Sequence, residues 1–406
     1  MHPKNLHIKD FNYDLPKEKI ALHPANPRDK AKLLIYQQDE ILEDSYTNLI
    51  RYLPEKSVLV FNDTKVVNAR IHFPKPTGAV IEVFCLEPYG TYTDHEQFFS
   101  QTEKAQWKCM IGKASKWKEK QLTKKIIIEG KEVILRAELI NRLEDAFVVE
   151  LSWTPENIPH GEILEKAGSI PLPPYIKRAV DPEDTQDYQT IYSEHEGSVA
   201  APTAGLHFTG KMLDSFRQNK IPLLFTTHHV GAGTFKPVSS AIMEGHIMHQ
   251  EWMSLSTLFL EQLLDHLDKE IISVGTTSTR ALESIYWMGN KILNNPEIPH
   301  EDLKISQWEV YDKQITHPPA DAVSALLTRL RERGENHLMI ETGIIIAPGY
   351  TFRIINGLIT NFHMPQSTLL LLVSALIGED WKKIYRYALE HDFRFLSYGD
   401  GSLLIP

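Results

Sequence analysis

The chain has 406 residues, of which 24% are charged, and a formal net charge of −10. This length exceeds what one hydrophobic core usually supports, so the sequence predicts two domains. The negative net charge argues against indiscriminate binding of nucleic acids, although an acidic protein can still carry one basic face.

Cysteine usage and hydropathy predict a cytoplasmic protein with no membrane partner. The two cysteines, Cys85 and Cys109, are too few for a disulfide framework and lack the spacing of a thiolate zinc site. The first residues, MHPKNLHIKDFNYDL, contain no apolar signal-peptide core. The longest apolar run, at 369–377, is about half of the roughly 20 residues that a spanning helix needs.

The pattern of apolar residues changes twice along the chain. Residues 57–64, SVLVFNDT, predict a short buried strand that ends in a polar turn. Short β-rich runs such as KKIIIEG and AFVVELSW then follow one another, with no convincing helix until about residue 163. After GSIPLPPYIKR, alternating strand-like and helix-like segments return. We expect an α/β protein, with a three-layer α/β main domain (1–66 and 153–406) and an inserted all-β, barrel-like domain (67–152).

Polar clusters follow or interrupt several strand-like runs, as expected where an α/β sheet presents side chains at the carboxyl ends of its strands. The turn in VGTTSTRALES precedes a helix and can hold a nucleoside or a carboxylate through backbone N–H groups. It can equally be an ordinary helix cap. The candidate residues in these clusters are Asn62, Asp63, Lys65, Thr203, Gly205, His207, His229, Gly231, Gly233, Thr276, Thr277, Arg280, Asn361 and His363.

The histidines admit both structural and catalytic interpretations. A single buried histidine is more often a hydrogen-bonded structural group, whereas several in polar loops favour proton transfer. The adjacent His228 and His229 point in opposite directions if they lie in a strand, so at most one should face a site. Side chains that commonly bind metals are present, but none has HxxxH, HxH or CxxC spacing, so we expect no metal site. These side chains are His207, His229, His249, Glu251 and His363.

Residues 104–125 are rich in lysine. They include eight lysines against one acidic residue, Glu119, with Trp107 and Trp117 between them. That composition suits contact with a phosphate backbone. It is also typical of a solvated strand edge on which lysines discourage aggregation, and composition alone slightly favours this second interpretation.

Several long motifs follow one another along nearly the whole chain, and they include VFNDTKVVNAR, PLPPYIKR, DYQTIYSEHEGSVAAPTAGLHFT, HVGAGTFKPV, VGTTSTRALES, APGYTFRIINGLITNFHMPQSTLLLLVSALIG and FLSYGD. In this order they resemble the S-adenosylmethionine:tRNA ribosyltransferase-isomerase family of the queuosine pathway. The resemblance implies an α/β main domain interrupted by a β-barrel, and no metal. It also implies that the ribosyl part of S-adenosylmethionine moves to the aminomethyl group of a 7-deazaguanine at the tRNA wobble position. The product would be epoxyqueuosine, with loss of adenine and methionine.

The implied partners are S-adenosylmethionine, as a substrate with no prosthetic group, and the tRNA anticodon stem-loop; we expect a monomer. The sulfonium charge acidifies the adjacent 5′ carbon, so a positioned general base can remove its proton, and the incoming amine must be neutral to attack. Imidazoles titrate in a suitable range, and carboxylates can orient them or face the sulfonium. We therefore expect catalytic residues that meet in one pocket, namely His207, His229, His363, Asp63 and Asp400. His207 is our choice for proton transfer because its neighbours are the smallest.

The expected substrate contacts are Asn62, Lys65, Tyr175, Arg178, Thr203, Gly205, Gly231, Gly233, Thr276, Thr277, Arg280 and Asn361. The chain departs from the family pattern in extra sequence around 88–104 and 286–340, and in Gly401 and Ser402, where the family has Ala-Met. Because insertions can reshape an RNA surface, a paralogue that uses S-adenosylmethionine on a different nucleoside or small molecule stays open. A non-catalytic RNA-binding scaffold is a third alternative, against which the many titratable groups beside glycine turns argue.

Overall fold

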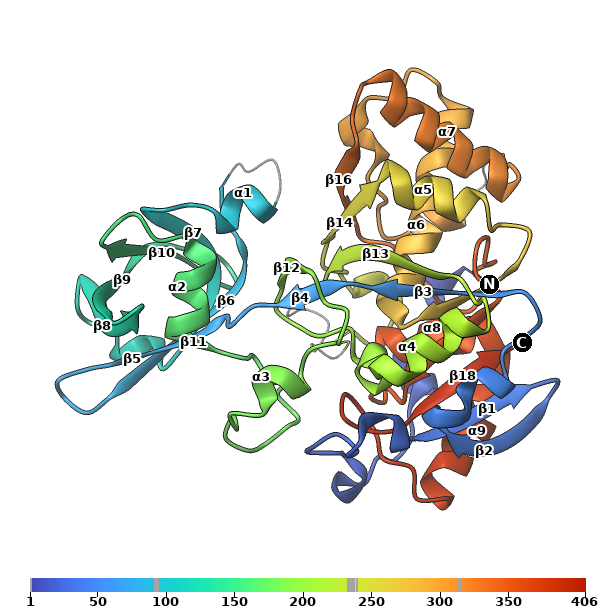
Figure 1. The fold of residues 1–406 in the computed structure, drawn as a ribbon, viewed down its shortest axis with the longest axis horizontal. Coiled ribbons are helices and arrows are strands. Elements are labelled where there is room, and N and C mark those ends of the chain that lie inside the picture. The colour runs from blue at the N-terminus through green and yellow to red at the C-terminus, as the bar shows by residue number, and fades with distance from the viewer. Residues whose placement is uncertain (1, 91–94, 232–237, 239, 313–314) are drawn as a thin grey trace.

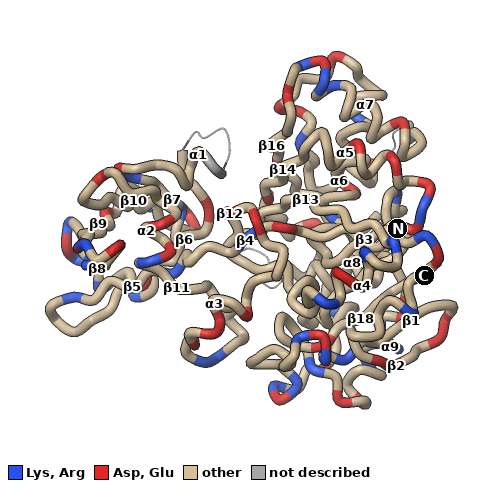
Figure 2. Tube along the Cα trace, viewed as in Figure 1, with Lys and Arg blue, Asp and Glu red and all other residues tan. Residues whose placement is uncertain are grey.

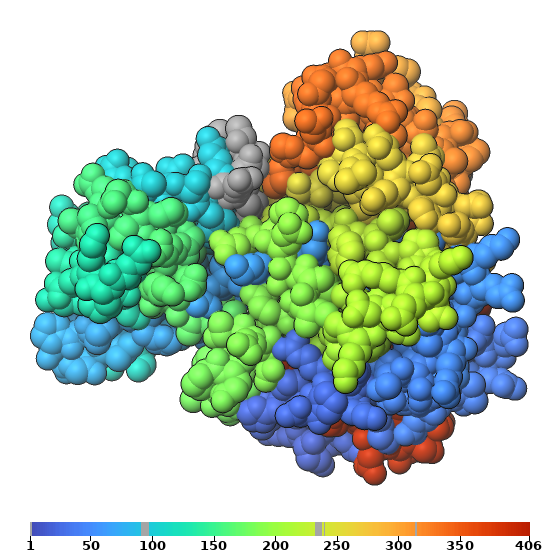
Figure 3. Space-filling view, in the orientation of Figure 1, coloured from blue at the N-terminus to red at the C-terminus, as the bar shows by residue number. Residues whose placement is uncertain are grey.

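The computed structural model describes residues 2–90, 95–231, 238, 240–312 and 315–406, and it has two lobes joined by a narrower middle (Figure 1, Figure 3). The larger lobe is built on a mixed sheet covered by helices, and the smaller lobe on a curled antiparallel sheet. None of the helices in these ranges combines the length and the apolarity needed to cross a membrane.

Within the described residues, nine strands form the sheet of the larger lobe, in the order β16-β14-β13-β3-β15-β17-β18-β1-β2. β3 is parallel to β13 on one side and to β15 on the other, and β15 is parallel to β17. Four parallel strands therefore end at the same edge of the sheet. The strands are β1 (Lys32–Gln37), β2 (Glu40–Ser45), β3 (Ser57–Asn62), β13 (Leu223–His229), β14 (Glu251–Ser256), β15 (Glu270–Val274), β16 (His337–Thr342), β17 (Gly357–Asn361) and β18 (Gly401–Ile405).

Helices cover both faces of this sheet. All six residues of β3 are buried, and they alternate between two cores. Leu59 and Phe61 share a core with α4, whereas Val58 and Val60 share the opposite core with α5, α6, α8 and α9. A strand covered on both faces gives a continuous apolar run, which is why SVLVFN lacks polar alternation. The helices of this lobe are α3 (Asp184–Asp187), α4 (Gly210–Gln218), α5 (Thr257–Leu264), α6 (Thr276–Asn294), α7 (Pro319–Glu332), α8 (Thr368–Ile377) and α9 (Trp381–Glu390).

The smaller lobe is a half-barrel. In the described part of the chain, seven antiparallel strands follow the order β11-β5-β6-β7-β10-β9-β8, and the edge strands β8 and β11 do not pair with each other. The sheet curls over α2 (His160–Ala167), and α1 (His95–Phe99) lies at its rim (Figure 1). Its strands are β5 (Arg70–Pro74), β6 (Val80–Pro88), β7 (Lys104–Gly112), β8 (Gln121–Ile128), β9 (Lys131–Arg142), β10 (Phe147–Thr154) and β11 (Gly168–Ser169).

Two neighbouring segments of the chain connect the lobes. β4 (Thr64–Val66) continues from β3 toward β5 and pairs with β12 (His195–Ser198). The chain returns through β11, which pairs with β5. Asp63 lies between β3 and β4, at the root of this connection.

The structure confirms a mixed α/β fold with a β-rich segment, and it shows an open half-barrel where the sequence suggested a barrel. The two segments outside the family pattern add to the cores. In 88–104, Phe98 of α1 is buried against Trp107. In 286–340, α7 packs on α6 so closely that a Cβ on Gly289 would lie 1.9 Å from the carbonyl oxygen of Ala322.

His160 predicts how the stability of the protein depends on pH. It is fully buried, its Nε2 accepts a hydrogen bond from Trp107 Nε1 (2.8 Å), and burial lowers its pKa to about 3. Below pH 6.5 the unfolded chain therefore binds a proton that the folded chain does not. The free energy of unfolding should fall as the pH falls, by roughly 1.4 kcal/mol per pH unit for such a histidine.

We predict that His160→Gln reduces this slope between pH 6 and pH 4 in urea denaturation. Trp107→Phe is the matched control, because it removes the same hydrogen bond but keeps the titrating imidazole. It should lower the stability without flattening the slope. Equal slopes for His160→Gln and the parent would contradict the prediction.

Candidate functional site

The residues at the carboxyl ends of the parallel strands are held together by the side chain of Asn62, the last residue of β3. Its Nδ2 donates to the carbonyl oxygen of His228 (2.9 Å), and its Oδ1 accepts from the backbone N–H groups of His228 (3.0 Å) and Thr64 (3.2 Å). Asn62 is 1% exposed. Its amide therefore joins the ends of β3 and β13 and is not itself presented to a ligand.

A cavity of about 340 Å³ lies at the ends of β13, β15 and β17, and we call it the strand-end cavity. This volume is within the range of small-molecule sites, roughly 300–1,000 Å³. Apolar side chains such as Val230, Phe362 and Leu396 form much of its wall. The expected site residues that line it are Tyr175, Thr203, Thr276, Thr277, Asn361 and His363.

The first turn of α6 forms one wall of the strand-end cavity. Gly275 precedes the helix with φ +94°, a conformation that favours glycine. Thr276 and Thr277 follow it and line the cavity. The backbone N–H groups of a first turn have no acceptor within the helix and carry the positive end of its dipole. This wall can therefore accept an oxygen-rich or anionic group.

His363 is the imidazole that lines the strand-end cavity. Its backbone is anchored by two tyrosines, since its N–H donates to Tyr385 Oη (3.0 Å) and its carbonyl accepts from Tyr13 Oη (2.5 Å). Its Nε2 lies 2.9 Å from Thr360 Oγ1. Burial lowers the pKa of His363 to about 3, so the ring is neutral near pH 7.

His207 lies behind the cavity wall, which differs from the expectation that it reaches the ligand. It is 4% exposed, its ring stacks on Tyr46 with centroids 4.3 Å apart, and its Nε2 is 3.0 Å from Asn361 Nδ2. Burial lowers its pKa to about 3. The small residues before it, including Ala201 and Ala204, do line the cavity, so they bring the backbone close and leave the imidazole behind.

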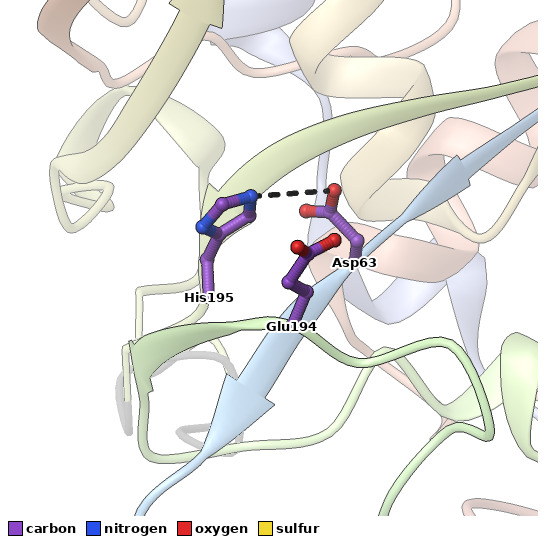
Figure 4. A group of neighbouring side chains, drawn as sticks. All are labelled: Asp63, Glu194 and His195. Carbon is purple, nitrogen blue, oxygen red and sulfur yellow. Dashed lines mark ion pairs between the residues drawn. The ribbon is translucent and has the colours of Figure 1, made fainter.

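Asp63 and His229 lie in a second, larger space, the interlobe groove, of about 850 Å³. Asp63 Oδ1 accepts from Thr227 Oγ1 (2.7 Å), and burial raises the pKa of Asp63 to about 6. His195 Nε2 lies 3.9 Å from Asp63 Oδ2, with Glu194 beside them (Figure 4). The smaller lobe contributes Phe99, Pro159, Glu162 and Glu165 to the opposite wall.

The five expected catalytic side chains thus do not line one pocket. β13 ends between the two spaces, because His229 lines the groove while the next residue, Val230, lines the cavity. Asp400 lies in neither. It is 2% exposed and accepts hydrogen bonds from the N–H groups of Lys32 (2.9 Å) and Arg394 (2.7 Å), which closes a turn.

The other expected contact residues have structural partners or open surroundings. Arg178 binds both carboxylate oxygens of Asp184 (2.6 and 2.7 Å), and Lys65 pairs with Glu196 (2.9 Å). Arg280 pairs with Glu251, which also contacts His228 Nε2 (3.1 Å). Gly205 leaves room for Tyr192, whose hydroxyl would lie 2.0 Å from an added Cβ. A Cβ added to Gly231 would meet no atom within 4 Å, and Gly233 is outside the described residues.

Sequence reasoning missed Glu194 and His195, although both lie in a quoted motif. They lie where an irregular segment meets β12, and no periodic pattern of apolar residues predicts that this part of the chain passes beside Asp63. Sequence reasoning did separate His228 from His229. His228 is fully buried between Thr277 and Glu251, whereas its neighbour faces the groove, as strand alternation predicts.

Among the described residues, one group could offer three metal ligands, namely Asp63, Glu194 and His195, with ligand atoms within 4.8 Å of one another. Glu194 and His195 are largely exposed, and exposed acidic groups commonly occur without an ion. The histidines considered from the sequence as ligand types do not form such a group in the described part of the chain.

The eight lysines of 104–125 differ in their surroundings, and one of them, Lys124, donates to the carbonyl oxygen of Ala167 (2.7 Å). Four of them pair with carboxylates of the curled sheet, and Figure 2 shows acidic and basic residues interspersed there. Lys113, Lys116 and Lys118 are exposed in the β7–β8 connection, and none of the ion pairs found among the described residues includes them. The paired lysines are Lys104 with Glu150, Lys108 with Glu87, Lys120 with Glu138 and Lys125 with Glu132.

Comparison with known proteins matches residues 8–404 to the family model described as queuosine biosynthesis protein. A relative from Zymomonas mobilis named S-adenosylmethionine:tRNA ribosyltransferase-isomerase is 35% identical over 401 residues, which cover 98% of each chain. One of the same name from Aquifex aeolicus is 34% identical over 406 residues, covering 98% of this chain and all of the relative. A crystal structure of an S-adenosylmethionine tRNA ribosyltransferase from Thermotoga maritima has 24% identity and a TM-score of 0.46, over 98% of this chain and 100% of the other.

Proposed function

Because the chain belongs to the S-adenosylmethionine:tRNA ribosyltransferase-isomerase family of queuosine biosynthesis, we propose that it acts on a 7-aminomethyl-7-deazaguanine at the tRNA wobble position. It transfers and isomerises the ribosyl moiety of S-adenosylmethionine onto the aminomethyl group. The products are epoxyqueuosine-tRNA, adenine and methionine. The enzyme works in the cytoplasm as a monomer, with no metal or prosthetic group.

The strand-end cavity receives S-adenosylmethionine. Its volume suits a nucleoside, and its apolar wall suits an adenine ring. The first turn of α6 offers N–H groups to ribose or carboxylate oxygens. The observation that carries the proposal is that this cavity, at the shared edge of four parallel strands, contains a neutral imidazole.

His363 is the general base. The sulfonium charge acidifies the 5′ carbon of the ribose, and a neutral imidazole within reach can take that proton. Substrate-bearing RNA enters from the interlobe groove, on the other side of the end of β13. There Asp63, whose pKa of about 6 leaves it ionised near neutral pH, attracts the aminomethyl group and orients it with His195.

A direct assay tests the proposed function. The protein is incubated with S-adenosylmethionine and an anticodon stem-loop that carries the aminomethyl-deazaguanine, and the RNA mass is measured. Conversion to epoxyqueuosine with free adenine supports the proposal. A stem-loop with guanine at the wobble position is the control, and the same reaction in EDTA tests independence from metal. Modification of only a different nucleoside would favour the paralogue alternative.

We predict that His363→Gln lowers turnover by roughly 10²–10⁴-fold, the usual contribution of a general base, and largely keeps S-adenosylmethionine binding. Glutamine can still contact Thr360 but cannot take the proton. His266→Gln, at a half-buried position that lines neither the cavity nor the groove, is the control and should keep parental turnover. Parental turnover in His363→Gln would exclude His363 as the base.

The pKa of Asp63 predicts that kcat/KM for the RNA falls on the acid side of its pH profile. Below about pH 6 the carboxylate gains a proton and loses its attraction for an ammonium or amine, so kcat/KM for the RNA should fall. Asp63→Asn keeps the acceptor for Thr227 but cannot titrate. Its kcat/KM for the RNA should be low at every pH, without this fall on the acid side. An unchanged fall in Asp63→Asn would assign it to another group.

The lysines of the β7–β8 connection that form none of the ion pairs found among the described residues predict how RNA affinity depends on salt. Replacing Lys113, Lys116 and Lys118 with glutamine should weaken RNA binding and reduce the slope of log K against log salt by roughly 2–3, if each contacts one phosphate. The matched control replaces Lys104, Lys108 and Lys120, which already pair with carboxylates, and should change the slope less. An unchanged slope in the first variant would identify these lysines as a solvated edge.

A further inference from the structure

We propose that Asn361, held in place by His207, reads a hydrogen-bond donor on the nucleoside part of S-adenosylmethionine. This inference rests on the proposed function, and it gives His207 a positioning role in place of proton transfer. The inference rests first on the side-chain oxygen of Asn361. Asn361 lines the strand-end cavity and is 3% exposed, and its Oδ1 is buried without a hydrogen-bond partner.

The orientation of the Asn361 amide follows from its neighbours. One amide atom lies 3.2 Å from the carbonyl oxygen of Leu396, which can only accept, so that atom must be the nitrogen. The same nitrogen lies 3.0 Å from His207 Nε2. Both amide hydrogens are therefore used inside the protein. The remaining oxygen can only accept, and it is left for a ligand.

His207 is suited to hold this amide. Burial keeps its imidazole neutral, and a neutral ring whose Nε2 accepts from Asn361 carries its proton on Nδ1. The lone pair that a general base would use is thus already bound. Tyr46 stacks on the ring and limits its rotation.

Gly401 makes the stacked position of Tyr46 possible. It lies opposite Asn361 in the β17–β18 pair, and an added Cβ would lie 2.0 Å from Tyr46 Oη. Such an approach requires the aromatic ring to move, because its hydroxyl cannot bend away alone. The series of contacts from Gly401 through Tyr46 and His207 thus ends at Asn361, whose unpartnered oxygen belongs to a side chain that lines the cavity.

A buried acceptor without a partner destabilises the empty site, and a ligand donor removes that cost. A ligand that presents an acceptor at the same point gains nothing and meets repulsion. The adenine amino group and the ribose hydroxyls are the donors of the nucleoside. Asn361 therefore discriminates between nucleosides by the presence of a donor.

Equilibrium binding of S-adenosylhomocysteine, which cannot react, measures the effect of each variant. Asn361→Ala should weaken binding about tenfold. His207→Leu, which fills the space without an acceptor, should weaken it several-fold. His207→Gln should stay near the parent, because its side-chain oxygen can accept from Asn361. In the Asn361→Ala background, His207→Leu should have no further effect.

Kinetics separate positioning from a merely structural role or from proton transfer. His207→Leu should raise the KM for S-adenosylmethionine with little change in kcat, and the pH profile of kcat should keep its shape. A fall in kcat of the size expected for a lost base, in both His207→Leu and His207→Gln, would overturn the positioning role. Thermal melting identifies a variant that is not folded.

Ligand analogues identify the donor and need only the parent and Asn361→Ala. S-inosylhomocysteine lacks the amino group, and the 2′-deoxy and 3′-deoxy analogues of S-adenosylhomocysteine each lack one hydroxyl. One of these should bind the parent about tenfold more weakly than S-adenosylhomocysteine, and the difference should vanish in Asn361→Ala. The inference would be overturned if all three analogues bound the parent and Asn361→Ala with the same ratio as S-adenosylhomocysteine. It would also be overturned if only 5′-methylthioadenosine, which lacks the amino-acid part, changed that ratio.

These outcomes are distinct from failure of the proposed function. A parent that converts the stem-loop, with Asn361→Ala binding S-adenosylhomocysteine as tightly as the parent, would overturn this inference alone. A parent that neither binds S-adenosylhomocysteine nor converts the stem-loop would overturn both.

Discussion

The parallel pairing of β3 with β13 and β15 is the constraint on which both candidate spaces depend. Helices cover both faces of the sheet, so the interior of β3 is apolar, and the amide that joins the strand ends, Asn62, lies at its carboxyl end. The strand-end cavity and the interlobe groove lie on opposite sides of the end of β13. Under the proposed function, a nucleoside in the apolar cavity and an RNA in the groove would approach the end of β13 from different sides and would not compete for one entrance.

Sequence patterns predicted the features that follow from the regular alternation of strand residues. They failed for side chains whose positions depend on a single contact with a distant part of the chain. The buried run of β3 and the opposite directions of His228 and His229 follow from burial and strand alternation. The position of His207 does not, because its partner Asn361 is 154 residues away and no pattern encodes that contact. Asp400 was expected either to orient an imidazole or to face the sulfonium, but its oxygens accept hydrogen bonds from the N–H groups of Lys32 and Arg394, contacts that form only when the turn is folded.

The two connections between the lobes have a dynamic consequence. The curled sheet has a core of its own, and the larger lobe is held by separate cores on the two faces of its sheet. The neighbouring pairs β4–β12 and β5–β11 link these units. Bending at this link would change the width of the groove at the cost of contacts in the small core that spans the link, which includes Val66 and Ile170. Asp63 lies where β3 leaves the sheet.

Gly401 and Tyr46 form a pair that evolution can only change together. With a side chain at 401, the hydroxyl of Tyr46 has no room, so a homologue that carries alanine there must place its aromatic ring elsewhere or dispense with it. Support for the imidazole at 207 must then come from another residue. We therefore expect the positions equivalent to 46 and 401 to covary among relatives, even though they lie at opposite ends of the sequence.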